Sequence, residues 1–504
     1  MQEINNFILK HEKKILFLLV AICLSYTIFF AVNTTTPNGQ DTYWYMNLAK
    51  SLTSGDGYTF EGQYPHSQYP PGLPILLIPL FLIFGNMYIG GLIMIALFSV
   101  LTLLLTYKIG KLLSPLVAVI ATILLLFHNL FVSFTTSILT EIPFAFFSLL
   151  GLYLFIKGFE NKKYFVFAFP VIAFTCLIRY DGFLLIFPMI FYTFINRQKI
   201  KKLIFQDSFL IGIVSGSLIL GAWFLRNFIA FGNPLYSSYT GYDFHLGFSS
   251  IYSFATLFFF TGFLFPIFAL IGAYFIIREK NKIFTTLIIW FFSYLTIHSI
   301  WGFKLLRFYS EILPVISIFT AYGIIKISQK IKSKKKLFAV AVMLLIIFSQ
   351  TFILFNQNIG IWSSTGIFKA INQYSPIKDV CEWANDNLPD DAVYMVSDYP
   401  AYSFYLNKPN IVNYNQGFNY LLSNQNNQQF YLIVDTHHAW ITAPYLNSSQ
   451  GNFTLNVQTN QGLPAKVFFE TELVSEIYYN KPLLKQPVQN QSAYIVKILS
   501  MEIK

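Results

Sequence analysis

The sequence has 504 residues, of which 55% are hydrophobic and only 11% are charged, and its formal net charge is +11. Soluble domains carry about a quarter charged residues, so this composition excludes an ordinary soluble protein and predicts a chain that has lipid as its solvent. Nucleic-acid binding is a poor interpretation of the net charge, because the basic residues follow a membrane-topology pattern.

Apolar runs of the length that a helix needs to cross a bilayer recur along the chain. The first lacks a small-residue cleavage site and is expected to be a retained helix rather than a signal peptide. The run Leu73–Phe84 is shorter and contains Pro74 and Pro79, so we interpret it as an interfacial or half-buried segment. We expect about eleven transmembrane helices, at residues 14–32, 87–107, 115–133, 138–156, 164–178, 182–195, 208–230, 253–277, 283–301, 305–325 and 337–356.

Most of the 34 lysine and arginine residues lie in alternate loops between these runs. Short loops rich in Lys and Arg stay in the cytoplasm. The pattern therefore predicts a multi-pass protein of the cell membrane with a cytoplasmic N-terminus and an extracytoplasmic C-terminal domain. The basic loops lie at residues 10–14, 108–111, 157–163, 197–202, 278–282 and 326–336.

Two regions outside these runs are long enough to carry function. In the outer loop at 33–72, Tyr45, Leu48, Ala49 and Leu52 have helical spacing, and a Tyr-Pro-Pro-Gly turn at residues 69–72 leads back to the membrane. We divide the chain into a transmembrane domain, 1–358, to which this loop contributes, and a tail, 359–504. A helix from Ser375-Pro376 and strands at 392–396, 430–435, 466–471 and 493–499 make the tail a predicted small α/β domain.

Charged residues gather at the expected outer ends of the spans. Ionisable groups in a membrane are costly, so each needs a partner or a function. Any one of them is explained by an interfacial position or by pairing with a neighbour; the whole set predicts a site. Its acidic members are Asp41, Glu141, Asp181, Asp243 and Glu311, and its basic members are Arg179, Arg226, Lys304 and Arg307.

Glycosyl transfer from a lipid-linked phosphosugar needs such a set. A carboxylate takes the proton of the acceptor hydroxyl as that oxygen attacks the anomeric carbon. Arginine and lysine stabilise the negative charge that develops on the departing lipid phosphate. The donor lies in the bilayer, so its enzyme must be a membrane protein too.

Several stretches of the chain have the character of sequence motifs. They are Gly39-Gln40-Asp41 with its aromatic helix, Tyr69-Pro70-Pro71-Gly72, Thr140-Glu141-Ile142-Pro143, Trp223 to Asn227 with Phe231 to Tyr236, Lys304 to Pro314, and Glu382 to Pro389 with Tyr402 to Lys408. These stretches resemble the GT-C glycosyltransferases, in particular the family 39-like group of protein O-mannosyltransferases and aminoarabinose transferases. Their order and their shared membrane side make the resemblance specific, and it covers residues from about 30 to 410.

The resemblance implies an inverting transfer from a polyprenyl-phosphate sugar to an acceptor hydroxyl on a protein, lipid or glycan. It makes Asp41 the catalytic base or sugar-contacting acid and Glu141 the second acid. Arg226, Lys304 and Arg307 become candidates for the donor phosphate. We expect four further residues to contact the substrate: Arg179, Asp181, Tyr45 and Tyr69. For Arg179 and Asp181, a structural role as an ion pair fits the motif equally well. The first-loop motif has one Asp where eukaryotic mannosyltransferases have an Asp-Glu pair, so the acceptor is not carried over.

Three alternatives stay open from the sequence. Metal dependence varies among these enzymes, and although Cys23, Cys176 and Cys381 have no metal-ligand spacing, a divalent cation is not excluded. A secondary transporter would place its charges near the midplane and have related halves, which this sequence lacks. A non-catalytic glycan-binding surface protein would have no reason to keep both Asp41 and Arg307.

Overall fold

The computed structural model describes residues 2–33, 40–60, 64–237, 262–301, 306–331, 335–355, 377–396, 399–413, 429–435, 452–458, 464–479 and 491–503. The chain forms two compact units. The helical unit consists of Met1–Asn33 and Leu48–Phe368, and the tail unit consists of Thr34–Asn47 and Lys369–Lys504. Each unit is described below by itself.

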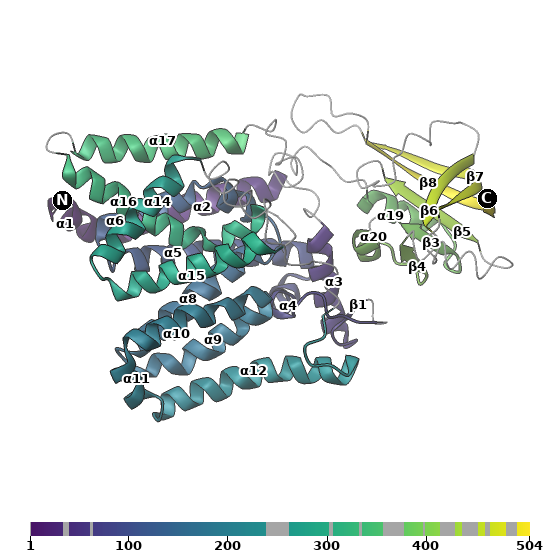
Figure 1. Cartoon of the computed structure of the whole chain (residues 1–504). Coiled ribbons are helices and arrows are strands. Elements are labelled where there is room, and N and C mark those ends of the chain that lie inside the picture. The colour runs from purple at the N-terminus through teal and green to yellow at the C-terminus, as the bar shows by residue number, and fades with distance from the viewer. Residues whose placement is uncertain are drawn as a thin grey trace. The chain divides into compact units, whose positions relative to one another are not determined.

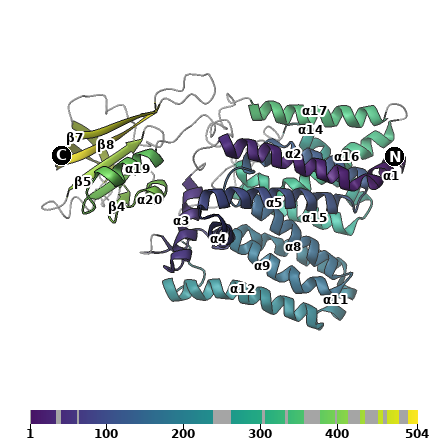
Figure 2. The same ribbon diagram turned by 180° about the vertical axis from the view of Figure 1, so that it is seen from behind.

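The helical unit is a bundle whose long helices run roughly parallel to one another (Figures 1 and 2). Its first helices are α1 (Gln2–Lys10), α2 (Glu12–Asn33), the second half of α3 (Gln40–Ser54), α4 (Gly72–Phe84), α5 (Met87–Gly110), α6 (Pro115–Leu126), α7 (Asn129–Phe134) and α8 (Glu141–Gly158). There follow η1 (Lys162–Tyr164), α9 (Phe165–Ile178), η2 (Tyr180–Leu185), α10 (Ile186–Ile195), α11 (Arg197–Leu203) and α12 (Asp207–Phe231). The last are α14 (Leu264–Arg278), α15 (Lys282–Ile300), η3 (Leu306–Ile312), α16 (Leu313–Lys330) and α17 (Lys335–Phe355).

Five helices of the described part are long and apolar enough to cross a membrane: Met87–Gly110, Glu141–Gly158, Asp207–Phe231, Lys282–Ile300 and Arg307–Lys330. Five further apolar helices are shorter, among them α4. The predicted class of helical membrane protein is therefore confirmed, whereas the number of eleven spans stays a prediction.

The two ends of the bundle differ in what they carry. The α1 helix and α11, which belong to two of the Lys- and Arg-rich segments, lie at the same end in both views (Figures 1 and 2). The α4 helix and the short hairpin of β1 (Thr59–Phe60) and β2 (Tyr64–Pro65) lie at the opposite end. The bundle thus places these two basic segments on one side, as the loop alternation requires.

The predicted span at 115–133 is interrupted. The α6 helix ends at Leu126, and His128 adopts an extended conformation before the short helix α7. The Nδ1 atom of His128 accepts a hydrogen bond from the Leu130 amide, which caps this new helix. Both pieces are apolar, so hydropathy alone did not reveal the break.

Close helix packing in the bundle depends on glycine. A Cβ atom on Gly272 in α14 would overlap the Phe319 carbonyl oxygen of α16, and one on Gly323 in α16 would overlap the Phe268 carbonyl oxygen of α14. Small residues let the backbones of two membrane helices approach in this way. The α16 helix is the most deeply buried of the candidate spans, and its contact with α14 contributes to this burial.

The tail unit has a mixed six-stranded sheet in the order β4-β3-β5-β8-β7-β6. The β3 strand (Val393–Val396) is parallel to β4 (Ile411–Asn413) and β5 (Phe430–Asp435), and the other pairings, with β6 (Asn452–Gln458), β7 (Pro464–Tyr479) and β8 (Gln491–Ile503), are antiparallel. Two helices, α19 (Ile377–Asn387) and α20 (Tyr399–Tyr405), complete it. The predicted α/β character is confirmed, and the strands β4 and β6 were not predicted.

The α3 helix is shared by the two units. Its residues up to Asn47 belong to the tail unit, and those from Leu48 onward belong to the helical unit. In the helical unit, Leu48 packs with Tyr58, Leu177 and Trp223. The predicted helical spacing of the outer loop is confirmed, since Tyr45, Leu48 and Ala49 are all buried.

Candidate active site

The α9 helix ends at Ile178, and the change of backbone direction there builds the centre of the site. Arg179 is extended, with φ −150° and ψ 140°, and the short 3-10 helix η2 follows it. Gly182 makes this tight return possible, because a Cβ atom at that position would lie 2.7 Å from the Cys176 amide nitrogen. Arg179 and Asp181 are thereby brought side by side, with Arg179 Nε 3.0 Å from Asp181 Oδ2.

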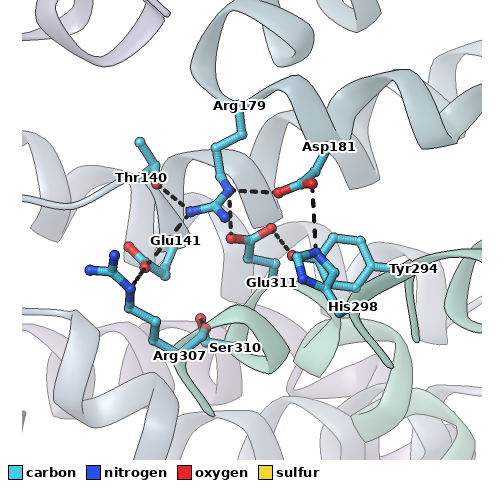
Figure 3. Close-up of polar contacts among 9 residues, drawn as sticks. All are labelled: Thr140, Glu141, Arg179, Asp181, Tyr294, His298, Arg307, Ser310 and Glu311. Carbon is cyan, nitrogen blue, oxygen red and sulfur yellow. Dashed lines mark hydrogen bonds and ion pairs between the residues drawn. The ribbon is translucent and has the colours of Figure 1, made fainter. Parts of the chain in front are cut away.

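Arg179 joins three segments of the helical unit, namely η2, η3 and the start of α8 (Figure 3). Besides Asp181, its Nε atom lies 3.0 Å from Glu311 Oε1 of η3, and its Nη1 atom donates a 3.0 Å hydrogen bond to Thr140 Oγ1. The Nη1 atom is also 4.0 Å from Glu141 Oε1. A planar guanidinium has five donors in a fixed fork, which suits this bridging position better than an ammonium group would.

Glu141 occupies the first turn of α8 and is 1% exposed. Its Oε1 atom lies 3.6 Å from Arg307 Nε, and neither of its carboxylate oxygens accepts a hydrogen bond from any residue in the described ranges. Two guanidinium groups and the positive end of the α8 dipole offset the cost of burying its charge. Glu141 is thus a buried carboxylate that can still accept hydrogen bonds, and a hydroxyl group of a substrate could donate one to it.

Three residues of this cluster had no role assigned from the sequence. Glu311 is fully buried, and its Oε2 atom accepts a hydrogen bond from the Tyr294 hydroxyl. His298, one helical turn after Tyr294 in α15, places Nε2 3.6 Å from Asp181 Oδ1 (Figure 3). Two signals were available: Glu311 lies inside the Lys304–Pro314 motif, and Tyr294 and His298 share one helix face by their i, i+4 spacing.

Among the residues that the structure describes, the cluster carries more negative than positive groups. Three carboxylates, those of Glu141, Asp181 and Glu311, surround two guanidinium groups, those of Arg179 and Arg307. With His298 neutral, the formal charge of these residues is therefore −1. All of them lie in a region where screening by water is weak, so the imbalance acts on any charged or polar group that enters.

Arg226 and Tyr69 belong to a different set of contacts. The Nη1 and Nη2 atoms of Arg226 donate to the carbonyl oxygens of His66 and Tyr58, at 2.7 and 2.5 Å. The ring of Tyr69 stacks on His66, and its carbonyl oxygen accepts a hydrogen bond from the Tyr58 hydroxyl. Arg226 therefore fastens the returning part of the outer loop to the end of α12, and these two donors are already engaged.

Three further predicted site residues are Asp41, Tyr45 and Lys304. Asp41 is half-buried in the first turn of α3 and Tyr45 is buried one turn later, both in the segment that belongs to the tail unit. Lys304, like Asp243, lies outside the described residues. Within the ranges that the structure describes, no group of three or more His, Cys, Asp or Glu residues has the arrangement of a metal site.

Comparisons with known proteins place this geometry in context. Residues 68–223 match the family model described as dolichyl-phosphate-mannose-protein mannosyltransferase. ArnT from Cupriavidus metallidurans bound to undecaprenyl phosphate is similar in structure, with a TM-score of 0.61 and 14% identity over 82% of this chain and 92% of that one. The apo state of the same protein gives a TM-score of 0.60, with the same identity and coverage.

An oligosaccharyltransferase from Archaeoglobus fulgidus, tethered with an acceptor peptide, has a TM-score of 0.56 and 15% identity, over 85% of this chain and 70% of that one. No curated protein matches the sequence. At these identities the solved structures establish a shared fold. Together with the family model, they confirm the resemblance to GT-C glycosyltransferases that the sequence motifs indicated.

Proposed function

We propose that this chain, which has the fold of GT-C membrane glycosyltransferases, transfers a sugar from a polyprenyl phosphate to an acceptor hydroxyl on the outer side of the membrane. The observation that carries the proposal is Glu141, a carboxylate buried in the helical unit between two guanidinium groups, whose oxygens accept no hydrogen bond from the part of the chain that the structure describes. A merely structural carboxylate at this depth would be expected to have its hydrogen bonds satisfied.

In this proposal Arg307 binds the phosphate of the donor. Its Nε atom is 3.6 Å from Glu141, and its side chain is about a fifth exposed, more than that of Arg179. A guanidinium can hold two phosphate oxygens at once and stabilise the charge that they gain as the sugar leaves. Since the phosphate and the anomeric carbon are neighbours in the donor, Arg307 would bring the sugar next to Glu141.

Asp41 and Glu141 have separate roles in the reaction. Asp41 takes the proton of the acceptor hydroxyl as its oxygen forms the new bond to the anomeric carbon, and the bond from that carbon to the phosphate oxygen breaks. The electron pair leaves with the polyprenyl phosphate, and one displacement inverts the anomeric centre. Glu141 accepts a hydrogen bond from a sugar hydroxyl and stabilises the positive charge of the oxocarbenium-like transition state.

Arg179 and its partners support these groups rather than bind the phosphate. Four groups already surround the Arg179 guanidinium. It holds the first residues of α8, and hence Glu141, against η2 and η3. Its proposed contribution is therefore to keep Glu141 in one position, since small displacements of a catalytic group can cost about a hundredfold in rate.

The compounds in the similar structures support a lipid-phosphate donor. ArnT was solved bound to undecaprenyl phosphate, and the Archaeoglobus oligosaccharyltransferase was tethered to an acceptor peptide. For this chain we propose an undecaprenyl- or dolichyl-type donor, and acceptors among proteins, lipids and surface glycans. A hexosyl transfer, such as that of mannose, and a pentosyl transfer are both consistent with the site.

The test is a transfer assay with the purified protein in lipid nanodiscs. A panel of radiolabelled polyprenyl-phosphate sugars is supplied with a membrane extract as acceptor, with and without Mg²⁺ or Mn²⁺. We expect Asp41→Asn and Glu141→Gln each to lower the rate about 10²–10⁴-fold, the usual range for a lost acid–base group. Glu160→Gln, a change at an exposed carboxylate, is the matched control. Wild-type rates in both active-site variants would contradict the proposal.

The proposed side of the membrane has its own test. The loop charges place the N-terminus in the cytoplasm and the tail unit outside. A reporter fused to the C-terminus, active only outside the cytoplasm, should give a full signal in intact cells. A cytoplasmic reporter signal would overturn the assignment of the site to the outer leaflet.

A further inference from the structure

The first half of α3 is held by the tail unit, although it lies far from the tail in sequence. Tyr43 is 2% exposed, and its ring lies 6.1 Å from that of Phe404 and 6.0 Å from that of Tyr405. The side chain of Asn47, one turn later, donates from Nδ2 to the Pro400 carbonyl oxygen at 2.9 Å and to Ser403 Oγ at 3.2 Å. One face of α3 therefore packs against α20.

Asp41 lies on the other face of this helix. Residues of an α-helix that are four and seven positions apart share a face, so Asp41 is aligned with Tyr45 and Leu48. Tyr43 and Asn47, which are also four apart, lie on the opposite side. The contacts with α20 are therefore on the face of α3 opposite to Asp41, the residue that acts as the base in the proposed mechanism.

Asn47 is the polar part of this attachment. It is 4% exposed, so its amide needs partners inside the protein, and both that it finds belong to α20. The aromatic contacts of Tyr43 would tolerate sliding and rotation. Two hydrogen bonds from one amide group to one turn of α20 select a single rotation of α3 about its axis.

We propose that Asn47 is a positioning residue through which the tail unit sets the rotation of α3 and hence the direction of the Asp41 carboxylate. This inference rests on the proposed role of Asp41. It assigns the tail a part in the reaction itself: although distant in sequence, it holds the helix that carries the base.

The test compares Asn47→Asp with Asn385→Asp in the full-length protein. Asn47→Asp replaces the amide group that donates to the Pro400 carbonyl oxygen with a carboxylate, which can only accept. The second makes the same chemical change inside the tail, where Asn385 Nδ2 donates to the Tyr405 carbonyl oxygen. We expect Asn47→Asp to lower kcat about tenfold to a hundredfold with the KM for the donor within about twofold, because a base is misplaced while phosphate binding is untouched. Asn385→Asp should keep kcat within about twofold.

Two further readouts separate positioning from general instability. Amide hydrogen exchange of Tyr43–Met46 should become faster in Asn47→Asp and stay unchanged in Asn385→Asp. The ratio of kcat for Asn47→Asp to that of wild type should rise as the pH falls from about 8 to about 5, since a protonated carboxyl can again donate to the Pro400 carbonyl oxygen.

The outcomes are distinct. Equal losses of kcat in the two variants, or unchanged exchange in α3 of Asn47→Asp, would overturn the role of Asn47. A wild-type kcat in Asn47→Asp, together with faster hydrogen exchange in α3, would also overturn this role. A wild-type protein inactive with every donor would instead sink the proposed function, and hydrogen exchange would then still decide whether Asn47 anchors α3.

Discussion

Arg179 and Glu311 form an ion pair in the interior of the helical unit, with 3.0 Å between Nε and Oε1. Glu311 is fully buried and also accepts a hydrogen bond from Tyr294. The pair joins η2 to η3, and the same guanidinium reaches Thr140 at the start of α8 (Figure 3). The position of Glu141 therefore depends on contacts between three separate stretches of the chain.

Removing the positive partner should cost more than removing the negative one. Arg179→Met leaves three carboxylates, of which Glu141 and Glu311 are buried, with one guanidinium, and loss of one partner of a buried pair costs about 3–5 kcal/mol. Glu311→Gln reduces the excess negative charge and leaves Asp181 beside Arg179, so we expect a loss of about 1 kcal/mol. Equilibrium unfolding in mixed detergent micelles measures both values. A larger loss for Glu311→Gln than for Arg179→Met would contradict the charge assignment.

Arg307→Lys tests the phosphate role. Lysine keeps the charge but cannot bind two oxygens with a rigid fork. Loss of one charge-assisted hydrogen bond costs about 1.5 kcal/mol, so the KM for the polyprenyl-phosphate donor should rise about tenfold. The KM for the acceptor should change less than about twofold. Arg278→Lys, at the end of α14, is the control. Equal increases for donor and acceptor would argue against a phosphate contact.

The contact between α14 and α16 should be intolerant of a methyl group. Gly272→Ala or Gly323→Ala forces a Cβ atom into a carbonyl oxygen of the facing helix, and overpacking of this kind costs about 1–3 kcal/mol. The matched control is Gly221→Ala in α12, where nothing lies within 4 Å of the added atom and helix propensity favours alanine. Thermal denaturation in detergent should show a lower Tm for the first two variants only.

His66 should make the outer loop sensitive to acid. Burial and the Arg226 guanidinium lower the pKa of His66 to about 4, whereas an unfolded histidine has a pKa of about 6.5. Its contribution to stability is therefore complete above about pH 6.5 and is lost as the pH falls toward 4, because the unfolded state binds the proton first. The decrease in Tm between about pH 7 and pH 5 should be smaller in His66→Gln. An identical decrease would show that His66 is not responsible.

Some features of the site followed from the motifs. Glu141, Arg179, Asp181 and Arg307 were predicted from their charge at helix ends, and the structure brings these four together. Glu311 was visible in the same motif but had no assigned role. Arg226 was expected at the donor phosphate, whereas the structure shows its contacts with the carbonyl oxygens of Tyr58 and His66. Charge and position along the chain do not reveal which donors are already used.

The sequence by itself determined the membrane class, most helices of the bundle and four strands of the tail. Hydropathy and side-chain periodicity are local properties, so they can be read without knowing the neighbours. Only the tertiary structure decided that Arg179 pairs with Glu311 and that Asn47 bonds to α20. These partners come from segments far apart in the chain, and which of several like charges or carbonyl groups meet depends on how the helices pack. The break between α6 and α7 at His128 could not be read from hydropathy either, because it is marked by a buried hydrogen bond and not by a change in hydropathy.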